Sequence, residues 1–152
     1  MRLLLVGKKG SGKSSLLYEL FKNCDCGGIV CIPVFEEGRL IGKDAINMAS
    51  GERRIFCRVK GLADFEGTET KNYIISREGM DFAIASLKKA MEKNLIIIDE
   101  FGVLEAREQG LFDAMKEILK REDKDVILVV REELEEKIGE KFPYDFKRIY
   151  MG

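Results

Sequence analysis

The chain has 152 residues, and its 26 lysines and arginines face 27 aspartates and glutamates, so the formal net charge is -1. That length suits one domain over residues 1–152 with one hydrophobic core, and the balanced charge, without a strongly basic block, gives no sign of a nucleic-acid partner. No apolar run reaches the roughly 20 residues of a membrane span, and the absence of histidine excludes Ser-His-Asp triads, histidine-ligated zinc and imidazole bases. We therefore expect a soluble, cytoplasmic protein.

Apolar runs and 3.6-residue periodicity predict strands and helices in alternation. In the first half they predict a strand at 3–6, a helix at 13–22, a strand at 28–35, an antiparallel excursion over 36–60 and a polar loop over 61–72. In the second half they predict a helix at 77–93, a strand at 95–98, a helix at 110–121, a strand at 126–130, a helix at 132–141 and a last strand at 147–151. Such alternation implies an α/β layered fold with a mainly parallel sheet, whose ligand crevice lies at the carboxyl ends of its strands.

Two of the predicted helices have an apolar face. The helix at 13–22 should bury Leu16, Leu17 and Leu20. Ser76 can cap the helix at 77–93, whose apolar face consists of Phe82, Ile84, Ala85, Leu87 and Met91.

The stretch Gly7–Ser14, GKKGSGKS, matches the pattern G-x-x-x-x-G-K-[ST] between a predicted buried strand and an amphipathic helix. Its glycines let successive amide N–H groups turn inward as an anion nest, and the positive end of the helix dipole points to the same place. Phosphate oxygens are the expected ligand. The predicted nucleotide-binding residues are Gly7, Lys8, Lys9, Gly10, Ser11, Gly12, Lys13, Ser14 and Ser15, of which Ser15 can simply continue the helix. The alternative is a glycine-rich turn with solvated lysines.

Two carboxylates, Asp99 and Glu100, follow the predicted strand at 95–98. A carboxylate there is costly unless a cation compensates it, so we expect Asp99 to hold Mg2+ through a water, with the Ser14 hydroxyl joining the coordination. Lys13 would reach the β- and γ-phosphates of a nucleoside triphosphate, and Glu100 would orient or deprotonate the attacking water. The alternative is that both acids are merely the polar end of a strand.

Other nucleotide-related patterns are incomplete. Residues 64–67, DFEG, match the D-x-x-G of small GTPases but follow no apolar strand, and no N-K-x-D motif is present to read guanine. A nucleotide kinase would need an arginine-rich lid, and the scattered arginines available for it are interpreted as solvated charges: Arg53, Arg54, Arg58 and Arg77.

The four cysteines are spaced unlike the paired C-x2-4-C knuckles of structural zinc sites. A four-cysteine zinc site is therefore the weaker interpretation. We expect Cys31 and Cys57 to be buried as small apolar residues in strands, and Cys24 and Cys26 to be reduced thiols in a loop.

Four pieces of the sequence, in order, resemble a known family: Gly7–Ser14, EEGRLIG at 36–42, Tyr73, and IIIDEFGVLE at 96–105. They are similar to the small P-loop nucleoside triphosphatases named from thermophile phosphatases and also found in animals. The resemblance covers most of the chain. It implies slow, Mg2+-dependent hydrolysis of ATP, GTP and other nucleoside 5'-triphosphates to diphosphate and phosphate, with little base preference, on a RecA-like sheet of strand order 5-1-4-3-2. A charged fraction of 35%, dominated by lysine and glutamate, fits a protein from a hot environment.

The more specific pieces of the resemblance add two candidate site residues, Arg39 in G-R-x-x-G and Glu105 in D-E-h-G-x-h-E, where h is apolar. The chain departs from the family in being shorter, which leaves the last strand open, and in carrying Lys43 where members usually have an apolar aromatic residue. Arg131, after the predicted strand at 126–130, is a candidate for an arginine that touches the γ-phosphate. It could instead be the first residue of a charged helix.

The sequence therefore predicts a P-loop nucleoside triphosphatase in which Glu100 activates water while Lys13 and Mg2+ stabilise developing charge. Two alternatives stay open. One is a kinase that transfers the γ-phosphate to a nucleotide or a small molecule. The other is a regulatory protein whose loop at 61–72 orders when nucleotide binds. No motif identifies a protein partner, a preferred base or an oligomeric state.

Overall fold

Nine strands form one continuous sheet in the computed structural model, which describes residues 1–152. The strands are β1 (Arg2–Gly7), β2 (Gly27–Glu36), β3 (Arg39–Asn47), β4 (Arg53–Val59), β5 (Gly67–Glu69), β6 (Tyr73–Ser76), β7 (Leu95–Phe101), β8 (Asp125–Arg131) and β9 (Lys147–Met151). Their order across the sheet is β5-β6-β4-β3-β2-β7-β8-β1-β9.

Five of these strands form the parallel part of the sheet. β1 pairs parallel with both β8 and β9, β7 pairs parallel with β8, and β2 pairs parallel with β7. Numbered in chain order, the parallel strands follow the order 5-1-4-3-2, so the predicted order is confirmed, and so is the last strand. In the register, Gly7 lies opposite both Arg131 and Met151. The carboxyl ends of three strands therefore meet at one edge.

The predicted antiparallel excursion is also confirmed, and it is longer than expected. β2, β3, β4 and β6 pair antiparallel in succession, with the first turn at Glu37 and Gly38. Within the predicted polar loop, residues 67–69 form β5, which pairs with β6. Every residue of β5 is exposed, so no alternation of apolar and polar side chains marked it as a strand.

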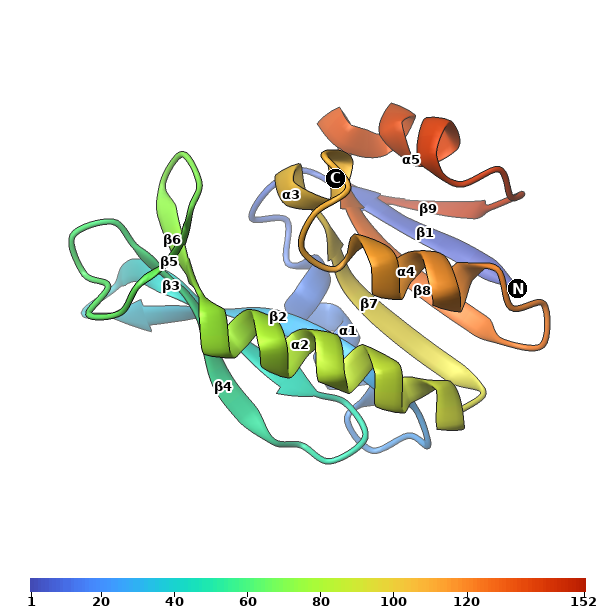
Figure 1. Ribbon diagram of the computed structural model, residues 1–152, viewed down its shortest axis with the longest axis horizontal. Helices are drawn as coiled ribbons and strands as arrows, with labels where there is room; N and C mark the ends of the chain where they lie inside the picture. The colour runs from blue at the N-terminus through green and yellow to red at the C-terminus, as the bar shows by residue number, and fades with distance from the viewer.

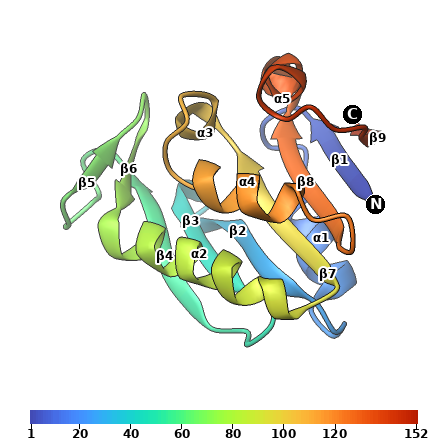
Figure 2. The same ribbon diagram turned by 45° about the vertical axis from the view of Figure 1, so that its right-hand side comes forward.

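The helices cover both faces of the sheet. They are α1 (Lys13–Phe21), α2 (Arg77–Lys89), α3 (Val103–Ala106), α4 (Phe112–Leu119) and α5 (Glu135–Lys141), with short 3-10 turns η1 (Ala90–Glu92) and η2 (Glu132–Leu134). Figures 1 and 2 show α2 and α4 side by side on one face and α1 on the other. The molecule thus has the three layers expected of an α/β fold. None of its helices combines the length and apolarity needed to cross a membrane.

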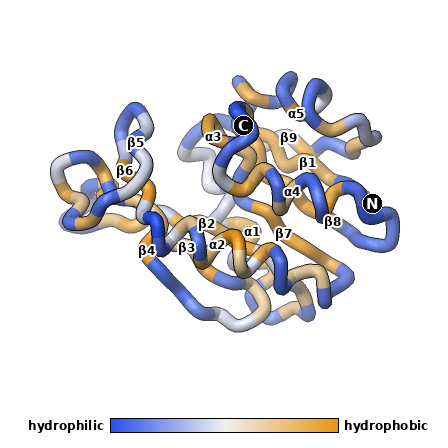
Figure 3. The backbone as a smooth tube through the Cα atoms, viewed as in Figure 1, coloured by the Kyte–Doolittle hydropathy of each residue, from blue (hydrophilic) through white to orange (hydrophobic).

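Alternating side chains of the central strands supply a core on each face. Leu4 and Val6 of β1 belong to the larger core with residues of α2, α4 and α5, whereas Leu5 belongs to the smaller core with Leu17 of α1. Figure 3 shows the resulting hydrophobic run along the central strands. The apolar face of α1 is narrower than predicted, because Leu16 and Leu20 are exposed.

The start of α2 is as predicted, since the Ser76 hydroxyl accepts a hydrogen bond from the Gly79 amide at 3.1 Å. Its buried face is shifted from the predicted one. Of the predicted residues, Leu87 is fully buried, whereas Ala85 is exposed. The buried stripe instead runs through Gly79, Ala83, Ser86 and Leu87, which recur with the helical period. The single turn α3 was not predicted, since four residues are too few to show a helical period.

Candidate nucleotide-binding site

The segment between β1 and α1 is a tight loop whose backbone requires glycine. Gly10 and Gly12 have φ angles of 77° and 86°, in the left-handed region that side chains with a Cβ rarely adopt. The Ser11 amide donates to the Lys8 carbonyl at 3.1 Å, and the Leu16 amide donates to the Gly12 carbonyl at 3.0 Å, which starts α1. The free amides of the loop and the positive end of α1 thus face the same edge of the sheet, as an anion nest requires.

Lys13 is buried at the first position of α1. Its ammonium donates to the carbonyls of Gly7 at 2.9 Å and Lys8 at 2.7 Å, and to the Ser11 hydroxyl at 3.2 Å. Burial lowers the pKa of Lys13, while Glu100 and Asp99 act in the opposite direction. The ammonium is therefore fixed inside the loop, next to two carboxylates.

Asp99 and Glu100 occupy a bulge in β7. Ile98 lies opposite Leu128, but Phe101 lies opposite Val130, so β7 carries one extra residue across this step. A bulge changes where side chains point, and here it lets two consecutive carboxylates reach the same site. The structure thus brings both acids to the carboxyl edge beside the loop.

Asp99 is almost completely buried, and its Oδ2 accepts a hydrogen bond from the Cys31 amide at 2.9 Å. Burial and, to a lesser extent, the charge of Glu100 raise the pKa of Asp99 to about 6. Lys43, the Ser14 hydroxyl and the Cys31 amide act to lower the pKa, because each of them stabilises the carboxylate. The groups around Asp99 therefore balance the negative charge of its carboxylate only in part. A divalent cation with hard oxygen ligands would supply the missing charge, so the side chains of Asp99 and Ser14 fit Mg2+.

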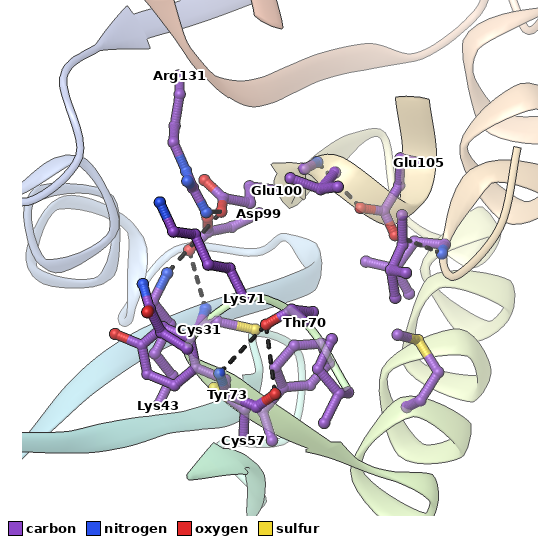
Figure 4. Close-up of a pocket in the computed structure, with 18 of the residues that line it drawn as sticks. Cys31, Lys43, Cys57, Thr70, Lys71, Tyr73, Asp99, Glu100, Glu105 and Arg131 are labelled. Atoms are coloured by element: carbon purple, nitrogen blue, oxygen red, sulfur yellow. Dashed lines mark hydrogen bonds and ion pairs between the residues drawn. The ribbon is translucent and has the colours of Figure 1, made fainter. Parts of the chain in front are cut away.

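Two cations hold the carboxylate of Glu100. Its Oε1 lies 3.3 Å from a terminal nitrogen of Arg131 and 3.8 Å from the ammonium of Lys43. Burial by itself lowers the pKa of Lys43, but Glu100 and Asp99 outweigh it, so the pKa of Lys43 is raised. Figure 4 shows Arg131, Glu100, Asp99 and Lys43 converging in one place.

Arg131 is the last residue of β8 and lies opposite Gly7 in the sheet. It therefore belongs to the strand end and not to a helix, which begins only after it as η2. Its guanidinium also lies 3.8 Å from Glu133. The side chain is about one quarter exposed and faces the region between the loop and Glu100.

Glu105 is buried, and its two oxygens bind backbone amides. Oε1 accepts from Gly102 at 2.9 Å and Oε2 accepts from Leu111 at 2.8 Å. Burial is the main cause that raises the pKa of Glu105. Glu105 thus ties α3 to the start of α4, and the structure gives it a positioning contact and no free oxygen to offer a ligand.

Two further candidates lie at the margins of the site. Ser15 is exposed and lines a cavity with the phosphate loop. Arg39 is exposed at the tip of the β2–β3 hairpin, where it lines neither of the two cavities described below.

Two adjoining cavities open at the carboxyl edge. The smaller, about 200 Å³, is lined by the loop from Lys9 to Ser15 and by the half of the β2–β3 hairpin that lies next to its turn. The larger, about 600 Å³, lies beyond Glu100 between β6, α2 and α3. Six residues line both cavities: Lys9, Cys31, Lys43, Tyr73, Glu100 and Arg131.

Lys43 and Tyr73 line both cavities, although neither was a predicted site residue. In the sequence, Lys43 stands out only as a departure from the family pattern, and Tyr73 only as one of the residues that match it. The ammonium of Lys9 lies 5.4 Å from the centre of the Tyr73 ring, within the range of a cation–π contact.

The four cysteines are free thiols. Cys31 and Cys57 are buried in strands as predicted, and Cys24 is exposed. Cys26 is buried as well, which the sequence did not indicate. No group of three or more cysteine, aspartate or glutamate side chains gathers as a metal site.

Comparisons with known proteins agree with this geometry. A family model described as NTPase matches residues 2–149. The chain is 30% identical over 135 residues to the nucleoside-triphosphatase THEP1 of Thermotoga petrophila, covering 86% of this chain and 72% of that protein. It is 26% identical over 129 residues to the nucleoside-triphosphatase THEP1 of Thermococcus kodakarensis, covering 80% and 72%.

Two solved structures share the fold. The crystal structure of THEP1 from the hyperthermophile Aquifex aeolicus matches with a TM-score of 0.76 at 20% identity, covering 99% of this chain and 90% of that one. The solution structure of a human cancer-related nucleoside triphosphatase matches with a TM-score of 0.71 at 23% identity, covering 98% and 87%.

Proposed function

The chain belongs to the NTPase family, and from this membership we propose that it hydrolyses nucleoside 5'-triphosphates to diphosphate and phosphate, with Mg2+ and with little preference for the base. The observation that carries the proposal is the position of Glu100. Its carboxylate stands beside the phosphate loop, within reach of Lys43 and Arg131, at the edge where the strands end.

The loop and Lys13 would bind the triphosphate. The backbone amides around Gly10 and Gly12 would hold phosphate oxygens, and the Lys13 ammonium, now on the Gly7 and Lys8 carbonyls, would turn to the β- and γ-phosphates. Asp99, through water, and Ser14 would hold Mg2+, which when bound neutralises phosphate charge. Backbone amides contact phosphates and not bases, which supports low base selectivity across ATP, GTP, CTP and UTP.

Glu100 would accept a proton from the water that attacks the γ-phosphate. Arg131 and Lys43 fix the direction of its carboxylate, and their charges face the position where negative charge develops on the transferred phosphoryl group.

The test is phosphate release from ATP, GTP, CTP and UTP with Mg2+, comparing the wild type with Glu100→Gln. We expect all four nucleotides to be hydrolysed, and the variant to bind nucleotide normally but to lose about 10²- to 10⁴-fold in rate. Glu136→Gln, an exposed acid on α5, is the matched control and should retain full activity. Normal turnover by Glu100→Gln would reassign Glu100 to a structural role.

A further inference from the structure

The larger cavity is far bigger than an attacking water molecule requires. A water molecule occupies about 30 Å³ in the liquid, whereas this cavity measures about 600 Å³. That volume falls in the range of sites for small organic ligands. The cavity shares Lys43, Glu100 and Arg131 with the cavity of the phosphate loop, so a molecule bound in it would lie next to the group proposed to activate the nucleophile.

The walls of the cavity combine apolar and cationic groups. Apolar side chains from β4, β6, α2 and the α3–α4 region form its interior: Phe56, Ile75, Met80, Leu104 and Leu111. Two exposed cations, Lys71 and Arg107, stand among the lining residues, and neither forms an ion pair with a carboxylate. Figure 4 shows Lys71 beside Thr70 and Tyr73 at this cavity.

The acids that line the cavity do not neutralise these two cations. Asp99 is buried, Glu100 is paired with Lys43 and Arg131, and Glu105 binds two backbone amides. The remaining acid, Glu69, lies 3.9 Å from Lys60. The exposed side of the cavity therefore carries uncompensated positive charge, which favours an anionic ligand.

Resting on the proposed function, we propose that this cavity binds a small organic anion bearing a hydroxyl group, and that this hydroxyl accepts the γ-phosphate in place of water. The hydroxyl oxygen forms the bond to the γ-phosphorus, the bond from that phosphorus to the β–γ bridging oxygen breaks, and Glu100 takes the hydroxyl proton. The products are a nucleoside diphosphate and a phosphate monoester of the acceptor, with one proton released to solvent. Lys71 and Arg107 bind the anionic group of the acceptor.

The experiment measures where the label of γ-³²P-ATP goes when an acceptor probe is added to the protein with Mg2+. The anionic probes are ribose 5-phosphate, glycerol 3-phosphate and glycerate, and the neutral controls are ribose and glycerol at the same concentrations. Labelled organic phosphate is separated from free phosphate. We expect at least one anionic probe to be labelled, about tenfold more than its neutral counterpart.

Three variants locate the acceptor. Lys71→Ala and Arg107→Ala should each lower transfer about tenfold, while phosphate release without a probe stays within twofold of the wild type. Val103→Trp, at an exposed position that lines the cavity, should block transfer by filling space. Lys88→Ala and Leu62→Trp, at exposed positions outside the cavity, are the matched controls and should change neither reaction.

The outcomes separate this proposal from the proposed function. Phosphate release without labelled organic product from any probe would overturn the acceptor site and leave hydrolysis standing. Equal labelling of anionic and neutral probes, or transfer unaffected by all three variants, would also overturn it. Absence of both release and transfer would overturn both proposals.

Discussion

At the scale of single residues, the ammonium of Lys13 has two sets of partners. It donates to two carbonyls and a hydroxyl of its own loop, yet it lies close enough to Glu100 and Asp99 for both to affect its pKa. Binding a triphosphate would exchange neutral acceptors for phosphate oxygens. The ammonium would then gain a Coulombic attraction to the phosphate charge that carbonyl and hydroxyl oxygens do not offer, so the exchange favours the nucleotide.

Removing this ammonium should therefore abolish function. We expect Lys13→Ala to lose at least about 10²-fold in nucleotide affinity or turnover, measured with a fluorescent triphosphate analogue and by phosphate release. Thermal unfolding of the same variant checks that the fold persists. Lys22→Ala, at the other end of α1, is the control. Wild-type behaviour of Lys13→Ala would refute the assignment of the loop.

Glu105 provides a test that depends on pH. Its raised pKa means that the folded protein binds a proton at pH values where the unfolded chain has released it. Its contribution to stability is therefore complete below the unfolded pKa, near 4.3 for a glutamate, and declines as the pH rises through the folded pKa.

We expect the free energy of unfolding of the wild type, relative to Glu105→Gln, to fall as the pH rises above about 4. Urea titrations at several pH values measure it, with Glu136→Gln as the surface control. Near neutral pH the variant should be less stable by about 1–3 kcal/mol, because one amide of Gly102 or Leu111 would face an NH2 group. A constant difference across the pH range would contradict the burial of an ionisable group at this position.

Individual residues of the site were predictable from sequence only where a motif fixed their spacing. Gly7–Ser14 and Asp99-Glu100 stood next to apolar strands, so their meeting at one sheet edge followed from topology. Lys43 reaches Glu100 from β3, and β3 lies next to β2 only through antiparallel pairing. No spacing along the chain shows that contact. Glu105 was chosen from a motif, and only the structure shows both of its oxygens on backbone amides.

At the scale of elements, the junction of β6 and α2 depends on one hydroxyl. Ser76 ends the strand and caps the helix, and the helix then packs across β2, β3 and β4. The cap thus fixes one end of the helix that borders the larger cavity. This helix was predictable because its thirteen residues show several turns of the helical period. β5 and α3, with three and four residues, are too short to show a period.

We expect Ser76→Ala to lower the free energy of unfolding by about 1 kcal/mol, measured by urea denaturation. Ser76→Thr, which keeps a hydroxyl in nearly the same place, should lose clearly less. Equal losses in the two variants would mean that the position matters for packing and not for the hydrogen bond to Gly79.

At the scale of the whole molecule, the order of the parallel strands was predictable because the resemblance carried it and the alternation of strands and helices agreed with it. The full extent of the antiparallel part of the sheet was not predictable. The cavity between that part and the parallel sheet is lined by residues spread from Lys9 to Arg131, and no local sequence pattern predicts such a cavity.

Binding of Mg2+ and nucleotide should stabilise the entire fold, because the site joins β1, β7 and β8. With β,γ-imido-ATP at one hundred times its Kd, linkage adds about 2.7 kcal/mol, which raises the thermal midpoint by roughly 5–10 °C for a protein of this size. Scanning calorimetry measures the shift. EDTA should remove most of the increase in the thermal midpoint, and the Lys13→Ala variant should show no increase. A shift that is unchanged in EDTA would refute the role of Asp99 and Ser14 in holding Mg2+.

The position of β1 in the sheet has a consequence for synthesis of the protein. β1 is paired on one side with β8 and on the other with β9, so, among the nine strands of the sheet, the first to be synthesised is held by the last two. At 5–20 residues per second the delay is on the order of ten seconds. During that time β1 has no neighbouring strand, so the glycine-rich loop that follows it is not held at the edge of the sheet. A nascent chain should therefore be unable to retain nucleotide until residues 147–151 have emerged.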